Sequence, residues 1–204
     1  MLSLYKKNHE NKDDERIGLF EKIQENHDIE KVVYPGSYAH ITPAFIFKHV
    51  IFNDTYKKLE KFYDADDVYE YICDRKQYNE EPYYTYIRGN YKNKLPIDNE
   101  SFDLLISQYA GFISLHCKKY LRKGGILVAN NSHGDASMAS IDPDFKFIAV
   151  VHKRSKKYYY TSKSLEKYFI PKKSIKITKD VLLKRGRGIG YTKYAGNYIF
   201  QKIK

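Results

Sequence analysis

The sequence lacks tryptophan, and its 204 residues include only two cysteines, Cys73 and Cys117. So few cysteines exclude a disulfide framework and make a reducing compartment the expected one. No cysteine–histidine cluster has the spacing of a zinc site, so we expect no bound metal. No apolar run approaches the roughly 20 residues that span a bilayer. Residues 1–15 are polar and have no apolar signal-peptide core, so we expect a cytoplasmic protein without membrane contacts.

Acidic residues are almost missing from the last quarter of the chain. Residues 146–204 contain 17 lysines and arginines but only Glu166 and Asp180, whereas residues 1–145 contain 19 basic and 23 acidic residues. The formal net charge of the whole chain is +11. Such a basic segment favours attraction to a polyanion, so nucleic acid is an expected partner through residues 146–204. The alternative is an ordinary solvated, lysine-rich surface.

Hydrophobic periodicity predicts a single α/β domain over residues 1–204. Short apolar runs predict strands at 31–34, 49–52, 83–88, 102–107 and 126–129. Amphipathic spacing predicts helices at 15–28, 42–48 (with Thr42 as N-cap and Pro43 at the first helical position), 55–74 and 111–121. Residues 145–153 and 158–161 favour a hairpin, 162–169 a short helix and 198–202 a last strand. This alternation predicts a mostly parallel sheet with helices on both faces and an antiparallel C-terminal edge. Within it we expect an N-terminal helical extension (1–30), an α/β core (31–151) and a basic part (152–204) that completes the sheet.

The loops that follow the strands are the expected binding sites, because ligands bind outside the carboxyl ends of parallel strands. The first loop begins Tyr34, Pro35, Gly36, Ser37, Tyr38, and its glycine permits a tight turn close to a ligand. His40 follows, and we expect it to contact a cofactor or to support the loop. Asp54 stands eighteen residues beyond Gly36, close to the spacing at which nucleoside-binding α/β folds place an acceptor for the ribose hydroxyls. Asp54 also suits the alternative role of capping the next helix.

Polar residues follow the other strands as well. Asn90 has the donor and acceptor that an adenine edge requires, and Tyr91 can flank a base. The remaining loops begin with Ser107, Gln108 and Tyr109 and with Asn130 and Asn131, and the two asparagines are candidates to hold a substrate. His133 and Asp135 are the best acid–base pair, since a carboxylate can orient a histidine. Alternatively, Asp135 caps a helix and His133 is solvated. Arg187 lies within a glycine-rich segment that Arg185 precedes, and the two arginines either contact phosphate or belong to an ordinary loop.

The order of these motifs resembles that of class I, Rossmann-like S-adenosyl-L-methionine-dependent methyltransferases. VVYPGSY stands where these enzymes have their glycine-rich motif, VIFND matches the acidic end of the second strand, and YIRGNY matches the adenine motif. FDLLISQYAGF looks like the fourth motif, and LRKGGILVANN is close to the segment before the fifth strand. The resemblance covers roughly residues 31–151. It implies S-adenosyl-L-methionine as cofactor, bound by residues of the first four loops: Tyr34, Pro35, Gly36, Ser37, Tyr38, His40, Asp54, Asn90, Tyr91, Ser107, Gln108 and Tyr109.

The sequence departs from that family in ways that bear on function. The first motif has a single glycine, and the Asn-Pro-Pro-Tyr of amino methyltransferases and the Pro-Cys of cytosine-C5 enzymes are both missing. The leading hypothesis is a methyltransferase with a lean toward a nucleic-acid or nucleotide-containing acceptor. The alternative is a non-catalytic nucleic-acid-binding module with the same fold. A nicotinamide-dependent oxidoreductase is disfavoured because no GxGxxG follows the first strand. The motifs indicate neither the acceptor nor an oligomeric state.

Overall fold

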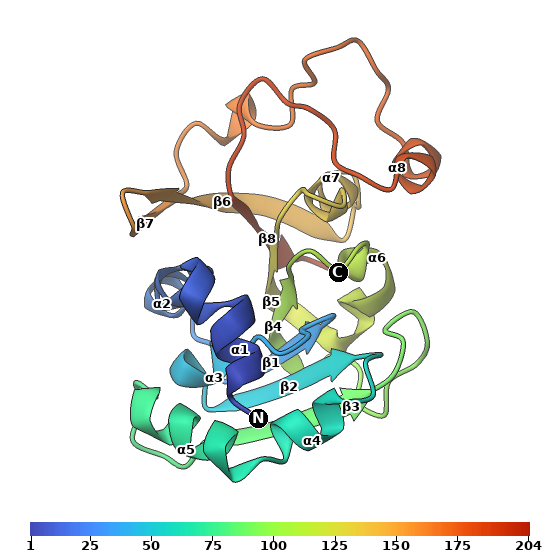
Figure 1. The fold of residues 1–204 in the computed structure, drawn as a ribbon. Helices are drawn as coiled ribbons and strands as arrows, with labels where there is room; N and C mark the ends of the chain where they lie inside the picture. Colours follow the sequence, from blue (N-terminus) through green and yellow to red (C-terminus); the bar gives the residue numbers. More distant parts are fainter. The chain divides into compact units, whose positions relative to one another are not determined.

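The computed structural model describes all 204 residues, and the chain forms two compact units, residues 1–96 and 97–204. Figure 1 labels their helices and strands along the chain. None of the helices combines the length and the apolar character that crossing a membrane requires. Cytoplasmic location and a single-domain organisation stay predictions.

The first unit has three parallel strands surrounded by short helices. Its elements are α1 (Ser3–Asn8), the 3-10 helix η1 (Glu10–Lys12), α2 (Ile17–Asn26), β1 (Lys31–Pro35), α3 (Pro43–Ile46), β2 (His49–Asp54), α4 (Leu59–Tyr63), α5 (Asp66–Arg75) and β3 (Tyr83–Arg88). The strand order is β3-β2-β1. Pro35 lies opposite Asn53, and Asn53 lies opposite Ile87. The three loops that follow these strands therefore leave the same edge of the sheet.

The helix predicted over 55–74 is wrong as a single element. The backbone of Ala65 is extended and separates α4 from α5. Asp66 and Asp67 lie in the first turn of α5. The helix dipole stabilises carboxylates at this end, whereas aspartate is unfavourable in a helix interior. Thr42 and Pro43 occupy the expected N-cap and first helical positions of α3. The Thr42 hydroxyl makes no capping hydrogen bond, because it bonds the Tyr5 hydroxyl instead.

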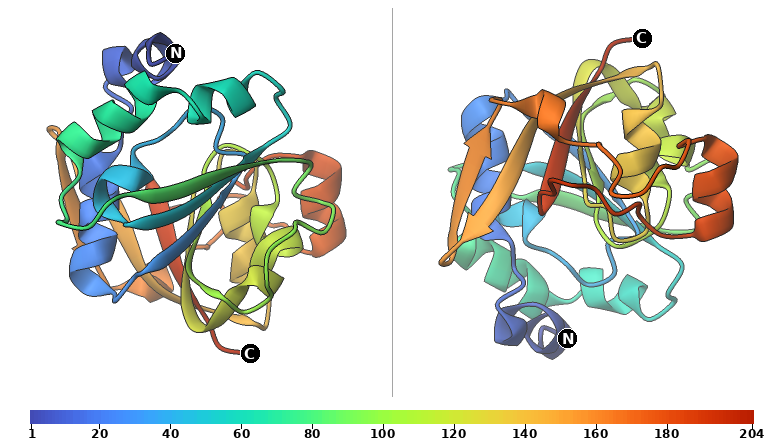
Figure 2. Two further views of the ribbon diagram at one scale, coloured as in Figure 1. Left: turned by 90° about the horizontal axis from the view of Figure 1, so that it is seen from below. Right: turned by 90° about the horizontal axis from the view of Figure 1, so that it is seen from above.

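The second unit has a five-stranded sheet with one parallel pair. Its elements are β4 (Phe102–Ser107), α6 (Ile113–Cys117), η2 (Lys118–Tyr120), β5 (Leu121–Ala129), α7 (Asp135–Ser140), β6 (Phe145–Arg154), β7 (Lys157–Thr161), η3 (Leu165–Lys167), α8 (Lys179–Arg185) and β8 (Asn197–Lys202). The order is β4-β5-β8-β6-β7, with β4 and β5 parallel and the other pairs antiparallel. The right-hand view of Figure 2 shows β8 beside the β6–β7 hairpin. The predicted α/β, Rossmann-like class with an antiparallel C-terminal edge is confirmed.

Helix α8 has no counterpart among the predicted elements, although the sequence carries its end signals. The Thr178 hydroxyl accepts the Val181 N–H at 3.3 Å, and Gly186 ends the helix with φ +60°. Leu182 is the residue through which α8 packs onto a buried cluster with Met138, Ile189 and Tyr191.

We expect Thr178→Ala to lower the free energy of unfolding by about 1 kcal/mol, the usual contribution of a side-chain N-cap. Urea unfolding checks this value. Thr192→Ala is a suitable control, because Thr192 is exposed and is not at a helix start. Equal effects of the two substitutions would contradict the capping role.

Candidate functional site

The loop after β1 folds back onto the end of β2. Gly36 has φ +67°, which only glycine adopts without strain. The Ser37 N–H donates to the Asn53 carbonyl at 3.1 Å, and the Tyr38 N–H donates to Oδ2 of Asp54, also at 3.1 Å. The other carboxylate oxygen of Asp54, Oδ1, accepts the Tyr56 N–H at 3.0 Å. Asp54 thus fixes the turn after β2, but it does not cap a helix as the alternative expected, because α4 begins only at Leu59. Its fixed carboxylate retains lone pairs for further donors.

Aromatic rings flank this carboxylate. The Tyr38 and Tyr56 rings stack with centroids 5.9 Å apart. The Tyr63 hydroxyl donates to the Tyr38 carbonyl at 2.7 Å and so holds the loop after β1 against α4. Burial, together with the nearby Tyr56 and Asp54, raises the pKa of Tyr38, so the Tyr38 hydroxyl remains neutral at physiological pH. The combination of a carboxylate and apolar ring faces suits a ligand with hydroxyl groups and an aromatic base.

Asn53, next to Asp54, presents an unused acceptor. Its amide nitrogen donates to the Ile87 carbonyl at 2.8 Å and to the Gly89 carbonyl at 2.9 Å, which fixes the orientation of the amide. Its Oδ1 is buried and has no hydrogen-bond partner. A buried acceptor without a hydrogen bond costs free energy and is rare in native proteins, so it indicates a place where a ligand donor can bind. Sequence reasoning overlooked Asn53 and Tyr56, although both lie within two residues of Asp54.

His40 does not face this site. It is 1% exposed, its Nε2 bonds the Glu15 carbonyl at 2.9 Å, and its Nδ1 bonds the Tyr34 hydroxyl at 3.2 Å. Burial, Arg16 and His9 hold its pKa well below the usual value, so the ring is neutral. Tyr34 is likewise buried. Of the two roles expected for His40, its geometry fits support of the loop and not contact with a cofactor.

The loop after β3 lies at the same sheet edge as Asp54. Asn90 is exposed, and its Oδ1 accepts the Lys92 N–H at 3.0 Å in a local turn. Its amide N–H₂ group remains a donor toward solvent. Tyr91, the next residue, is half-buried.

In the second unit, Asp135 belongs to a buried network and not to a pair with His133. Its carboxylate accepts the Ser107 hydroxyl at 2.5 Å, the Ser114 hydroxyl at 2.5 Å and the Ser114 N–H at 3.0 Å. Asp135 is 2% exposed, and burial raises its pKa to about 6 even though Ser107 and Ser114 act in the opposite direction. His133 is exposed and its Nδ1 lies 3.0 Å from the Ser132 hydroxyl. The expected orientation of His133 by Asp135 is therefore wrong, because the carboxylate ties β4 and α6 to the start of α7.

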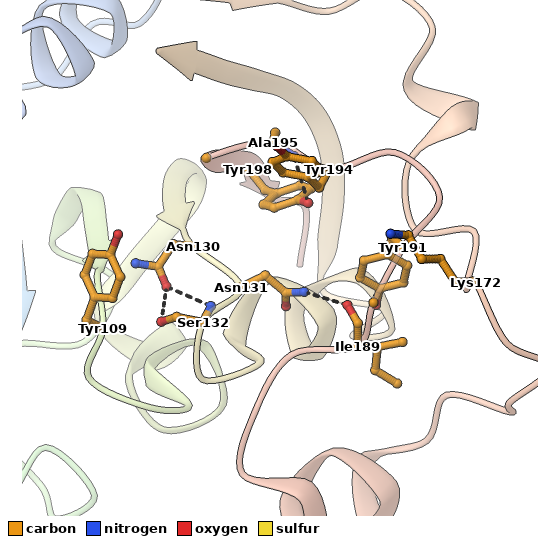
Figure 3. A pocket seen from close by; sticks show the side chains of 12 residues that line it. Tyr109, Asn130, Asn131, Ser132, Lys172, Ile189, Tyr191, Tyr194, Ala195 and Tyr198 are labelled. Atoms are coloured by element: carbon orange, nitrogen blue, oxygen red, sulfur yellow. Dashed lines mark hydrogen bonds between the residues drawn. The ribbon is translucent and has the colours of Figure 1, made fainter. Parts of the chain in front are cut away.

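Side-chain amides link the ends of β4, β5 and β8. The Asn130 amide donates to Gln108 at 3.2 Å, and the Gln108 amide donates to Asn197 at 3.0 Å. Asn130 Oδ1 also accepts the Ser132 N–H and hydroxyl. Asn131 donates to the Ile189 carbonyl at 3.3 Å (Figure 3). Ser107, Gln108, Asn130 and Asn131 thus use their side chains to hold the strand-end loops in place.

These loops border a cavity of about 330 Å³, which we call the tyrosine pocket. Its rings belong to Tyr109, Tyr191, Tyr194 and Tyr198, and Figure 3 shows Asn130, Asn131 and Ser132 beneath it. Tyr109 and Tyr194 are 58% and 78% exposed. The predicted substrate residues Arg185 and Arg187 are exposed and do not line this pocket. Sequence reasoning did not anticipate the contribution of residues 189–198.

No model of a known protein family matches the chain, and no curated protein matches it significantly. Among solved structures, a candidate S-adenosyl-L-methionine-dependent methyltransferase from Methanococcus maripaludis aligns with 18% identity over 64% of this chain and 65% of its own, with a TM-score of 0.45. A methyltransferase from Thermotoga maritima, described as a possible histamine N-methyltransferase, aligns over the full length of both chains with 12% identity and a TM-score of 0.49. The [4+2]-cyclase SpnF aligns over 57% of this chain and 44% of its own, with 11% identity and a TM-score of 0.40. The chain spans less than two thirds of the length of the first and third structures.

Proposed function

We propose that the protein is an S-adenosyl-L-methionine-dependent methyltransferase whose first unit binds the adenosine part of the cofactor at Asp54. The observation that carries the proposal is the carboxylate of Asp54, fixed by two backbone N–H groups at the end of β2. It stands at the motif position that the resemblance assigns to the ribose acceptor. The spare lone pairs of Asp54 suit two hydroxyl donors, and the unpaired Oδ1 of Asn53 suits an amino donor.

The chemistry of this reaction needs little from the protein beyond orientation. S-adenosyl-L-methionine supplies a methyl group on a positively charged sulfur, and proximity and alignment account for most of the acceleration of such a displacement. The Tyr38–Tyr56 pair supplies a flat apolar wall beside Asp54. Where the acceptor atom carries a proton, His133 is the proposed base because it is exposed and its Nε2 is not engaged. The proposal gives Asp135 and His40 no contact with reactants.

We propose further that the acceptor contains a nucleotide. The excess of lysine and arginine in residues 146–204 supports this lean, since phosphate groups bind to such surfaces. The alternative is a non-catalytic module that binds nucleic acid without a cofactor.

Asp54→Ala is expected to weaken binding of S-adenosyl-L-methionine at least about tenfold, because each hydrogen bond to a charged carboxylate contributes about 1.5–3 kcal/mol. Calorimetric titration with S-adenosyl-L-methionine and S-adenosylhomocysteine measures the effect, and thermal unfolding verifies that the variant is folded. Asp28→Ala is the matched control, since Asp28 is an exposed carboxylate that precedes β1, at the opposite end of the parallel strands. Unchanged affinity in Asp54→Ala would refute the ribose role. A folded wild-type protein that binds neither ligand would favour the non-catalytic alternative.

A further inference from the structure

The second unit carries a hollow surrounded by positive charge, which we call the basic hollow. It encloses about 790 Å³ and is bordered by the end of β6, the loop after β7 and the segment that leads into β8. Its cationic residues are Lys153, Arg154, Lys163 and Lys193. No aspartate or glutamate lines it. A concave surface of a single charge sign concentrates the electric field and attracts ions of opposite sign.

Three of the cations in the basic hollow are not neutralised by neighbouring carboxylates. Neither Arg154, Lys163 nor Lys193 forms an ion pair, and the Lys193 ammonium lies over the Tyr168 ring at 4.3 Å. His152 lies beside them with its Nε2 2.8 Å from the Tyr168 hydroxyl. Burial, and then Arg154 and Lys193, lower the pKa of His152. The histidine is therefore neutral at physiological pH.

The strand register extends this surface along the β6–β7 hairpin. His152 lies directly opposite Tyr159, and Arg154 lies opposite Lys157. Directly opposed residues of antiparallel strands, and residues two apart on one strand, share a face of the sheet. The face of the hairpin that carries His152 and Arg154 therefore also carries a further cation, Lys157, and a further aromatic ring, Tyr159. Tyr159 is half exposed.

Tyr194 connects the basic hollow to the tyrosine pocket, because it lines both. Tyr194 is 78% exposed, so its ring is accessible to a ligand. Figure 3 shows Tyr194 beside Tyr198, above Asn131 and Ser132 in this view. Exposed aromatic rings next to a cationic groove are the combination with which proteins bind single-stranded nucleic acids.

We propose that the basic hollow binds phosphate groups of a single-stranded nucleic acid, one base of which stacks on Tyr194. A strand fits better than a duplex, since bases must be unpaired to reach an aromatic ring. The proposal rests on the proposed function only in taking this strand as the methyl acceptor. Binding of the strand itself requires no cofactor.

The test measures binding of fluorescent RNA and DNA single strands of about ten nucleotides, and of the matching duplex, by anisotropy at several salt concentrations. We compare the wild type with R154E/K193E. Loss of two phosphate contacts should weaken binding more than about tenfold at physiological salt. The salt slope, which is the slope of log affinity against log salt concentration, should become smaller in magnitude by about 1.4. The control is K123E/K146E, which changes the net charge equally at exposed lysines outside the hollow. Lys146 lies eight residues before Arg154 on β6, about 26 Å away.

Each outcome decides the proposal. A fall of similar size in K123E/K146E would overturn it in favour of general charge attraction, and equal binding of the duplex would overturn the single-strand assignment. Displacement of the strand by inorganic phosphate or a free mononucleotide at equal concentration would assign the hollow to a small ligand instead. The RNA and DNA arms identify which polymer supplies the phosphates.

Variants of Tyr194 separate stacking from phosphate binding. We expect Tyr194→Ala to weaken binding about tenfold with an unchanged salt slope, whereas Tyr194→Phe should bind like the wild type. Full affinity in Tyr194→Ala would overturn the stacking role. Calorimetry with S-adenosyl-L-methionine is run in parallel, so strand binding without cofactor binding rejects the proposed function alone, and the reverse result rejects the basic hollow alone.

Discussion

Gly188→Ala should destabilise the protein by about 3 kcal/mol, toward the upper end of the usual range for overpacking. A Cβ atom at this position would lie 2.0 Å from the Asn131 carbonyl oxygen and 2.6 Å from its side-chain nitrogen. Either the segment or the loop after β5 must then move by more than 1 Å, which breaks the bond from Asn131 to the Ile189 carbonyl. The glycine-rich segment 186–190 is therefore needed for close backbone packing, a role that its sequence alone did not distinguish from phosphate binding.

Thermal unfolding of Gly188→Ala should show a melting temperature lower by roughly 6–12 °C for a chain of this size. Gly190→Ala is the matched control two residues away, because nothing lies within 4 Å of its added Cβ. We expect a change of less than about 1 kcal/mol there. Equal losses in the two variants would show that Gly188 and Asn131 are not in close contact in solution.

Asp135→Asn should change how stability depends on pH between about pH 4 and pH 6. In the folded protein the pKa of Asp135 is about 6, raised from 3.8 by burial. As pH rises through this window, the unfolded chain releases the proton first, so stability from this group is complete below about pH 3.8 and is lost as pH passes 6. The loss amounts to about 3 kcal/mol, because one pKa unit corresponds to 1.36 kcal/mol. Asparagine does not titrate, so the stability of wild type relative to Asp135→Asn should fall by about this amount from pH 4 to pH 7.

Urea unfolding of both proteins at several pH values measures this difference. Asp144→Asn is an informative control because Lys118 lowers the pKa of Asp144. A lowered carboxyl pKa stabilises the protein above the unfolded value and loses that effect toward acid, so the control should show a dependence of opposite sign. A flat difference between wild type and Asp135→Asn would mean that Asp135 keeps its ordinary pKa, in conflict with its burial.

The strands were predictable because local patterns determine them. The expected ranges 83–88 and 102–107 coincide with β3 and β4, whose apolar runs end at a clear polar boundary. Helices were less predictable. The break at Ala65 depends on packing, and the hydrophobic periodicity of residues 179–185 is too weak to have predicted α8. In the second unit, β5 begins at Leu121, five residues before the expected strand.

The site was predictable only where it depends on one strand end. The position of Asp54 follows from the strand before it, and the structure places it, partly exposed, at the end of β2. Its role toward a cofactor stays a prediction. The neighbours of Asp135 come from residues 107 and 114, and those of Asn131 from residues 137 and 189. Contacts between such distant positions leave no periodic signal in a single sequence, so His133 and Asp135 looked like a pair only because they are adjacent in the chain.

The position of β8 has a consequence for the order of assembly during synthesis. β8 is translated after β5, β6 and β7, yet it pairs on one side with β5 and on the other with β6. The hairpin of β6 and β7 therefore has no sheet to join until residue 202 has left the ribosome. Until then the exposed edges of β5 and β6 are open to pairing with other chains. We therefore expect a chain that ends before β8 to aggregate more readily than the chain that includes it.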